Sequence, residues 1–340
     1  MEQAITIGID IAKNVFEVHG RSLRGETALR RTLKRSQVEK FLGKLSPCLI
    51  GMEACGSAHH WARVARQHGH DVRLMPPAYV KPYAKRNKSD AIDAAACSEA
   101  VGRADMRFVA VKTVEQQAAL SLHRSRDLLV SQRTQLGNAL RALLSEYGIV
   151  AGTGPAGLAL LVGQLREGTF ALPEDAVIAA TALAAQHDAL TASANALERR
   201  IVDQAKADRK TRMLQTAPGV GPMISHATVA TMPDPALFPS GRAFAAWLGL
   251  TPRLSGTGGK MHTGSITKQG NPPLRRLLVL GATAWLRQVK ANPAKGSPWL
   301  RDMLARKPFK LVAVAQAART ARILWAMLTH DQPYRAPASA

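Results

Sequence analysis

Four acidic residues near the N-terminus have the type and spacing of metal ligands. Asp10 follows the apolar run 5–9, and Glu53 follows a second apolar run at 49–52. Asp90 and Asp93 are three residues apart, so they share a face if the segment is helical. Divalent ions prefer carboxylate oxygens, and phosphoryl transfer on DNA uses two ions roughly 3.5–4 Å apart. The four side chains therefore predict a site for two divalent metal ions.

The Asp90/Asp93 pair alone has a second interpretation. Asp90 can cap a helix while Asp93 is a solvated acid in its first turn. The basic residue Lys88, just before the pair, either holds a scissile DNA strand or belongs to a solvated loop.

Hydroxyl groups in the segment 255–260 form a second candidate for chemistry. Its sequence, Ser-Gly-Thr-Gly-Gly-Lys, lacks the Gly-x4-Gly-Lys-Ser/Thr spacing of a nucleotide-binding loop, so ATP hydrolysis is not expected. A mobile loop that carries a hydroxyl nucleophile is one interpretation, and an ordinary flexible loop is the other. In the first case Arg253, Lys260 and Lys268 supply positive charge that favours attack on a phosphodiester.

Positive charge dominates the composition. The formal net charge is +22 and the pI is near 10.7, which implies a polyanionic partner, either nucleic acid or an acidic membrane surface. Residues 211–340 contain 17 basic and only 3 acidic residues. A surface that served solubility alone would mix both signs. We therefore expect this region to contact nucleic-acid phosphates.

Length and cysteine usage narrow the class of protein. A chain of 340 residues, 46% hydrophobic, can hold two or three domains. We find no apolar stretch of the roughly 18–20 residues that a spanning helix needs, and no signal peptide. Three scattered cysteines fit a reducing compartment, so a cytoplasmic protein without a membrane partner is expected. The spacing of Cys55, His59, His60, His68 and His70 matches no common zinc site.

Strands and helices alternate in the first third. Periodicity predicts a strand hairpin at 4–11 and 15–19, strands at 48–52 and 71–75, and helices at 36–45 and 58–68. This alternation favours an α/β domain that ends near residue 110. If the strands ending at Asp10 and Glu53 are neighbours, both carboxylates lie at the same edge of the sheet.

Helices dominate the remainder. Residues 113–147 read as one long helix, 151–157 as a break, and 175–212 as a returning helical zone. This near-neutral hairpin serves either oligomerisation or spacing.

The last region begins with a short turn. Pro218, Gly219 and Gly221 form a turn typical of a helix-hairpin-helix, whose backbone N–H groups can hold a DNA phosphate. Further helices are expected at 274–290, beginning beside Arg275 and Arg276, and at 310–328.

The ordered motifs resemble those of a known family. Together they resemble transposases of the insertion-sequence one-ten family over nearly the whole chain: Gly-Ile-Asp at 8–10, Met-Glu-Ala at 52–54, Lys-Ser-Asp-Ala-Ile-Asp at 88–93, Pro-Gly-Val-Gly at 218–221, Trp-Leu-Gly-Leu-Thr-Pro-Arg at 247–253, and Ile-Thr-Lys-Gln-Gly-Asn at 266–271.

The resemblance implies a fold and an activity. It implies a RuvC-like (RNase H-like) α/β domain at 1–110 that supplies an Asp-Glu-Asp-Asp set, a helical coiled coil at 111–210, and a mainly α transposase domain at 211–340 with a helix-hairpin-helix-like element and a catalytic serine. It further implies a Mg²⁺-dependent DNA recombinase that forms a covalent phosphoserine. Its implied partners are element-end and target DNA, a structured bridge RNA and a second copy of the chain in a dimer or tetramer, in the bacterial cytoplasm and on the nucleoid.

The serine itself has more than one candidate. Counting from Pro252 places Thr257 at the family's nucleophile position, whereas the Ser-Gly pair places Ser255 there. We choose Ser255 because a primary hydroxyl is the less hindered nucleophile; Ser265 is a more distant candidate. Two other functions stay open from the residues: a RuvC-like nuclease that uses water, and a non-catalytic helix-hairpin-helix DNA-binding protein.

Overall fold

The computed structural model describes residues 5–84, 89–232 and 234–336. The chain divides into two compact units, Met1–Val114 and Glu115–Ala340, and each is described by itself.

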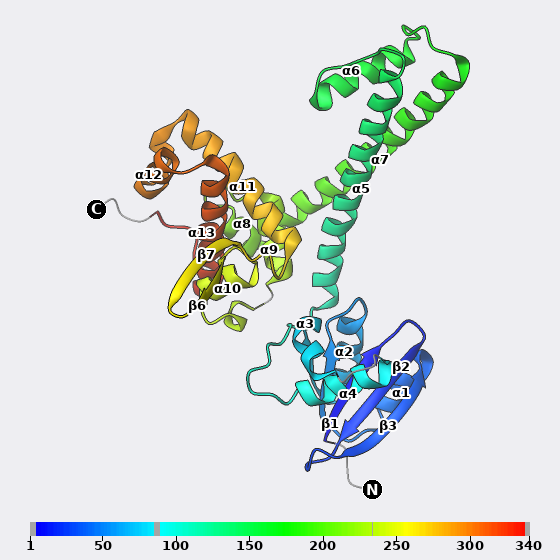
Figure 1. The fold of residues 1–340 in the computed structure, drawn as a ribbon, viewed down its shortest axis with the longest axis vertical. Helices are drawn as coiled ribbons and strands as arrows, with labels where there is room; N and C mark the ends of the chain where they lie inside the picture. The colour runs from blue at the N-terminus through cyan, green and yellow to red at the C-terminus, as the bar shows by residue number, and fades with distance from the viewer. Residues whose placement is uncertain (1–4, 85–88, 233, 337–340) are drawn as a thin grey trace. The chain divides into compact units, whose positions relative to one another are not determined.

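A five-stranded mixed sheet forms the centre of the first unit (Figure 1). Its order is β3-β2-β1-β4-β5, where the strands are β1 (Thr6–Ile11), β2 (Val15–Arg21), β3 (Thr27–Lys34), β4 (Leu49–Glu53) and β5 (Asp71–Met75). β1 and β2 form the predicted antiparallel hairpin, while β4 runs parallel to β1 and to β5. The α/β class predicted for this region is confirmed.

Helices cover both faces of this sheet. They are α1 (Val38–Leu42), α2 (Ala58–Gln67), α3 (Pro77–Val80) and α4 (Asp90–Ala100), with 3-10 turns η1 (Arg35–Gln37) and η2 (Lys81–Tyr83). Ile7, Ile9 and Phe16 are buried with Trp61 of α2 in one core. Because side chains alternate along a strand, the residues between them face the other side, where α4 packs on β1 and β2.

Two glycines allow α4 to lie very close to the sheet. Gly8 and Gly51 are paired across β1 and β4. A Cβ at Gly8 would lie 2.1 Å from the Ala94 carbonyl oxygen, and one at Gly51 would lie 2.8 Å from that of Cys97. A side chain at either position would therefore push α4 away from the strands.

The sequence pattern missed strand β3. Its sequence is rich in basic residues and no side chain in it is fully buried, so the apolar alternation of a half-buried strand is weak. The strand is defined instead by its antiparallel pairing with β2, which runs from the pair of Val15 with Lys34 to the pair of Arg21 with Thr27.

Long helices open the second unit. α5 (Val114–Ser145) and α7 (Glu174–Ala207) form the expected hairpin, joined by an ion pair between Arg126 and Glu198. The predicted break at 151–157 is wrong in its second half, because α6 (Gly154–Arg166) begins there. Leu158 and Leu161 of α6 bury the end of α5, including Leu140.

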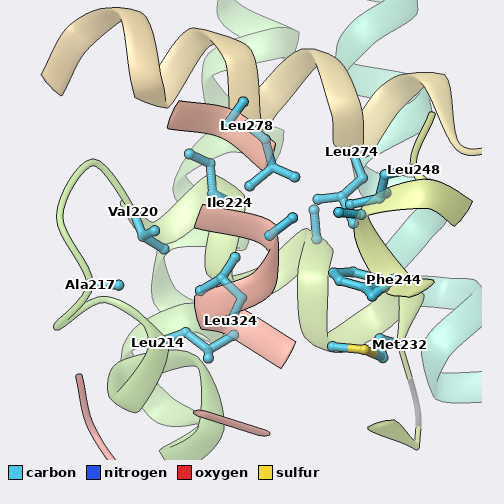
Figure 2. Close-up of a cluster of buried hydrophobic side chains, with 14 of the residues drawn as sticks. Leu214, Ala217, Val220, Ile224, Met232, Phe244, Leu248, Leu274, Leu278 and Leu324 are labelled. Carbon is cyan, nitrogen blue, oxygen red and sulfur yellow. The ribbon is translucent and has the colours of Figure 1, made fainter. Parts of the chain in front are cut away.

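A helical body follows. It contains α8 (Arg209–Leu214), α9 (Pro222–Thr231), α10 (Gly241–Trp247), α11 (Pro272–Ala291), α12 (Pro298–Arg306) and α13 (Phe309–His330), the 3-10 turns η3 (Pro235–Leu237) and η4 (Pro293–Lys295), and a hairpin of β6 (Pro252–Thr257) and β7 (Lys260–Ile266). Figure 2 shows its core, in which Ile224, Phe244, Leu278 and Leu324 come from four different helices. A helical C-terminal part is confirmed, although α12 was not predicted.

Helix α13 is long and apolar enough to cross a membrane by length and composition. Its residues Val312, Ala317, Ala321 and Leu324 are buried within the unit, which is also how the core helix of a globular domain is built.

We predict that Gly8→Ala destabilises the first unit by about 1–3 kcal/mol, the usual cost of overpacking a core. The added methyl would meet backbone atoms of Ala94 and Ser98, which cannot rotate away. Urea unfolding monitored by circular dichroism measures the change. Gly56→Ala is the control because no atom lies within 4 Å of its Cβ position; equal effects of the two variants would refute close packing at Gly8.

A buried histidine pair predicts pH-dependent stability of the second unit. His123 Nε2 and His226 Nδ1 are 2.9 Å apart. Burial, then the neighbouring charges of His226 and Arg126, lowers the pKa of His123 to about 4, and burial lowers the pKa of His226. An unfolded chain binds these protons near pH 6.5, so native stability falls as pH drops from about 6.5 towards 4.

Urea midpoints at pH 7.5 and 5.0 measure this effect. His123→Gln should show a flatter dependence than the unchanged protein. An identical slope in both proteins would contradict the assignment.

Candidate functional site

The register of two neighbouring strands brings Asp10 and Glu53 together. Ile9 pairs with Met52 across parallel strands β1 and β4, so the next residues, Asp10 and Glu53, continue side by side. Both alternate with residues of the α2 core and therefore lie on the α4 side of the sheet. The expectation that these carboxylates share an edge fits this arrangement.

Asp93 approaches the same place from α4. Asp93 and Cys97 are four residues apart on the helix and share a face. Burial raises the pKa of the Cys97 thiol well above its usual range. The negative charges of Glu53, Asp10 and Asp93 raise the pKa of this thiol further. A hydrogen bond with the Glu53 backbone has the opposite effect and lowers it. Three carboxylates thus act electrostatically on one buried thiol, which agrees with the position of α4 against β1 and β4.

Asp90 lies at the first turn of α4 and is exposed. Ser89 is the N-cap, and its Oγ accepts a hydrogen bond from the Ile92 N–H at 3.4 Å. The alternative in which Asp90 caps the helix is therefore wrong. Lys88 lies outside the described residues.

The donor set fits a divalent ion, since it consists of carboxylates on two adjacent strands and one helix. Within the described ranges, no three His, Cys, Asp or Glu side chains are arranged as a ready-made metal cage. Metal binding would therefore include adjustment of the side chains of Asp10, Glu53 and Asp93.

The segment predicted as a mobile loop is a β-hairpin instead. β6 and β7 pair through Thr257–Lys260 and Ser255–His262. Gly258 and Gly259 both have positive φ, 56° and 79°, as a two-residue type I′ turn requires. The glycines that suggested flexibility in fact form the tight turn.

Both hydroxyl candidates lie on one face of this hairpin. Paired residues in an antiparallel ladder point to the same side, so Ser255 and Thr257 share a face with His262 and Lys260. All six residues of β6 are exposed. The hydroxyls are accessible to a substrate strand, and the structure does not choose between them. Ser265, also exposed, lies on β7 near the hairpin base.

Close backbone contacts fix the base of the hairpin. A Cβ at Gly270 would lie 1.6 Å from the Trp247 carbonyl oxygen, and one at Gly249 would lie 2.3 Å from that of Gln269. Lys268 adopts φ of 58°, unusual for a residue with a side chain. Its N–H donates to the Gly249 carbonyl at 3.1 Å, which holds the Lys268 backbone beside the end of α10.

The cations predicted to bind nucleic acid have differing surroundings. Arg275 donates from Nη1 to the carbonyls of Leu248 and Gln269, each at 2.8 Å. Arg276 forms an ion pair with Asp127. Arg253 donates to the Thr267 carbonyl at 3.3 Å. Arg275 therefore supports the hairpin base, whatever else it contacts.

The Pro-Gly-Val-Gly turn joins α8 to α9, two helices in the order that a helix-hairpin-helix requires. Gly219 has φ of 75° and approaches Gly281 of α11. Pro218 and Gly221 flank it, and Gly221 is the N-cap of α9. Nucleic-acid binding at Pro218, Gly219 and Gly221 stays a prediction.

Sequence reasoning missed two residues beside the candidates. Glu17 pairs with Asp10 across β1 and β2, and His262 pairs with Ser255. Only strand register identifies such neighbours. The predicted β1–β2 hairpin could have identified Glu17 as the partner of Asp10. The β6–β7 hairpin was not predicted, so the sequence contained no signal for His262.

An α/β domain in which Asp10 and Glu53 are neighbours, together with a strongly basic helical unit, is compatible with an enzyme that acts on DNA. The comparisons define the class as transposase: a family model described as transposase matches residues 7–149, and one described as transposase IS116/IS110/IS902 family matches residues 211–305. The chain belongs to this insertion-sequence transposase family, as its motifs indicated.

Relatives that match over nearly their whole length support this family assignment. The transposase for insertion sequence element IS1111A of Coxiella burnetii is 37% identical over 340 residues, covering 98% of this chain and 92% of that protein. The transposase for insertion sequence element IS1328 of Yersinia enterocolitica is 36% identical, with coverages of 97% and 98%. The "Probable family 20 transposase" of Pseudomonas aeruginosa is 44% identical, also with coverages of 97% and 98%. Transposases with the DEDD domain are in general metal-dependent.

We predict that Arg275→Ala loosens the hairpin base and costs about 1.5–3 kcal/mol, since two carbonyls lose a charged donor. Limited proteolysis should then cut within 252–266 faster than in the unchanged protein. Arg287→Ala, an exposed arginine on the same helix, is the control. Equal cleavage rates for the two variants would show that Arg275 does not hold the hairpin.

Proposed function

We propose that this transposase cleaves and rejoins DNA through a covalent phosphoserine at Ser255, with Asp10, Glu53, Asp90 and Asp93 as ligands of two Mg²⁺ ions. The observation that carries the proposal is the β1–β4 register, which continues to Asp10 and Glu53 side by side, with Asp93 on the helix α4 that packs against the same strands. Bound Mg²⁺ would supply the positive charge that stabilises the phosphorane-like transition state and the leaving oxygen.

The chain's own residues perform the remaining tasks. Ser255 Oγ attacks phosphorus, so a new Oγ–P bond forms as the P–O bond to the leaving deoxyribose oxygen breaks. The serine proton passes to solvent, and the leaving oxygen takes a proton from solvent. Rejoining reverses these steps with a different DNA hydroxyl as the attacking group. The exposed, anchored hairpin supports this role because it can present Ser255 without obstruction.

The partners follow from charge and from the family resemblance. The excess of 14 positive charges in residues 211–340 supports contact with element-end and target DNA through Lys260, Lys268 and the α8–α9 turn. A structured bridge RNA, which the resemblance implies, would choose the sites, because phosphate contacts alone carry no sequence information. The protein would act on the nucleoid, in the cytoplasm.

A dimer or tetramer is part of the proposal. α5 has 32 residues, yet only His123, Gly137, Leu140 and Leu144 are buried in a single copy. A helix this long has surface available for a second copy of the chain.

The proposed domain organisation is a RuvC-like domain at 1–110, a coiled coil at 111–210 and a transposase domain at 211–340.

Asp10→Asn should lower DNA cleavage at least roughly 10- to 100-fold, because losing a metal ligand costs no less than losing its supporting partner. Protein coexpressed with its complete element would be incubated with Mg²⁺ and a plasmid that carries the joined element ends, and nicked products counted. Asp71→Asn is the control, since Asp71 is exposed and begins β5 at the opposite end of the strand from the Glu53 side. Unchanged cleavage by Asp10→Asn would refute the metal site.

Ser255→Ala should abolish the covalent protein–DNA adduct in the same reaction, while Thr257→Ala should retain it. The adduct is measured as DNA label that stays with the protein in a denaturing gel. Loss with Thr257→Ala alone would move the nucleophile to Thr257. Cleavage without any adduct in the unchanged protein would instead favour a nuclease that uses water.

A further inference from the structure

The outer strand of the N-terminal sheet carries an unexplained row of cations. Arg30, Arg31, Lys34 and Arg35 are all exposed, and none forms an ion pair with a carboxylate in the part of the chain that the structure describes. The cations accumulate at β3 and the turn that follows it, outside the C-terminal region that holds most of the net charge.

Strand register relates these cations to the carboxylates. Asp10 pairs with Glu17, and Glu17 pairs with Thr32 of β3. Arg30 and Lys34 lie two residues before and after Thr32, so they share its face. With strands about 4.8 Å apart, β3 lies roughly 10 Å from β1. The charge of Arg30 also helps to lower the pKa of His19, after burial, which agrees with this placement beside His19 on the α4 face.

A groove continues the positive surface around the end of β3. It has a volume of about 630 Å³ and is lined by Lys34, Arg35, Ser36, His60 and Trp61, among others. The Arg35 guanidinium lies 5.3 Å from the centre of the Trp61 ring, which holds it at the groove wall. His60 is exposed and packs edge-on against Trp61 at 5.0 Å. Trp61 is only 6% exposed, so it supports these two side chains and does not itself stack on bases. The exposed His60 ring and Arg35 guanidinium offer planes on which the unpaired bases of a single strand can stack.

Charges on an edge strand can also serve only to prevent pairing with another sheet. Lysine is the side chain most often used for that purpose, whereas three of the four cations here are arginines. Four cations follow one another along β3 and the turn after it, and Lys34 reaches the sheet end where Asp10 lies. Such a row instead matches a polyanion that approaches the carboxylates.

We infer that strand β3 and this groove bind the single DNA strand that flanks the scissile phosphate. Arg30 and Lys34 contact its phosphates on the carboxylate side, and Arg35 and His60 receive the strand in the groove. The inference rests on the proposed function, because it takes the carboxylates as the place of cleavage.

Binding of full-length protein to fluorescent oligothymidylate of about 20 nucleotides tests the surface. Each single-strand phosphate contact contributes about 0.7 to the slope of log affinity against log salt. Arg30→Ala/Lys34→Ala should therefore reduce the slope by about 1.4 and weaken binding roughly tenfold near 0.1 M salt. Anisotropy titrations over a range of salt concentrations give both values.

The control is Lys40→Ala/Lys44→Ala, which removes the same charge from exposed positions on α1 and just after it. It should leave the slope unchanged. A benzophenone amino acid at Ser36 should crosslink to the oligonucleotide, whereas one at Gln67, at the exposed end of α2, should not.

Three results would overturn the inference: equal slope changes in the two double variants, no change in either, or a reduced slope for oligouridylate but not for oligothymidylate, which would assign the surface to RNA. These binding results do not depend on cleavage. Retained cleavage by Asp10→Asn would refute the proposed function while leaving a demonstrated DNA-binding surface in place.

Discussion

The close contact between α4 and the sheet determines whether the N-terminal carboxylates can act together. Gly8 and Gly51 are paired on adjacent strands, and the lack of a side chain at both lets the α4 backbone lie directly on them. A hydrogen bond of 2.9 Å between His19 and Ser98 fixes α4 along the sheet. In the proposed metal site, where errors of only about 0.5 Å are tolerated, this contact would set how Asp93 meets Asp10 and Glu53.

The hairpin of the second unit solves a different physical problem. In the proposed function its hydroxyls must be open to a DNA strand, yet an exposed two-stranded ribbon is only marginally stable by itself. The chain fixes the base and leaves the end exposed. Gly249 and Gly270 allow backbone contacts that no larger residue fits, and Arg275 bonds to carbonyls on both sides of the hairpin. The packing and hydrogen bonds that stabilise the hairpin are therefore at its base, away from the exposed Ser255 and Thr257.

The sequence predicted the elements whose pattern is local. Apolar runs located β1, β4 and β5, and the sequence indicated that the acids after two of them would share a sheet edge if their strands were neighbours. What it missed depends on pairing between strands, even where the two strands are consecutive in the chain. β3 is a strand because it pairs with β2, and its basic side chains conceal this. The glycine-rich segment 255–260 was read as a loop, because two adjacent glycines indicate a turn as readily as flexibility. Glu17 and His262 became visible only through cross-strand pairing, since contacts of this kind leave no periodic signal.

The two reactive groups of the proposed chemistry belong to different compact units, with the carboxylates in residues 1–114 and the candidate hydroxyls in 115–340. Neither unit can then form the phosphoserine alone. In the proposed function, assembly with DNA and further copies of the chain brings hydroxyl and carboxylates to one phosphate. Arg30 and Lys34 would favour this assembly, because their positive charge offsets the repulsion between metal-free carboxylates and the phosphates of the DNA backbone. Electrostatic attraction of the strand would then precede the covalent step, and cleavage would depend on a complete assembly.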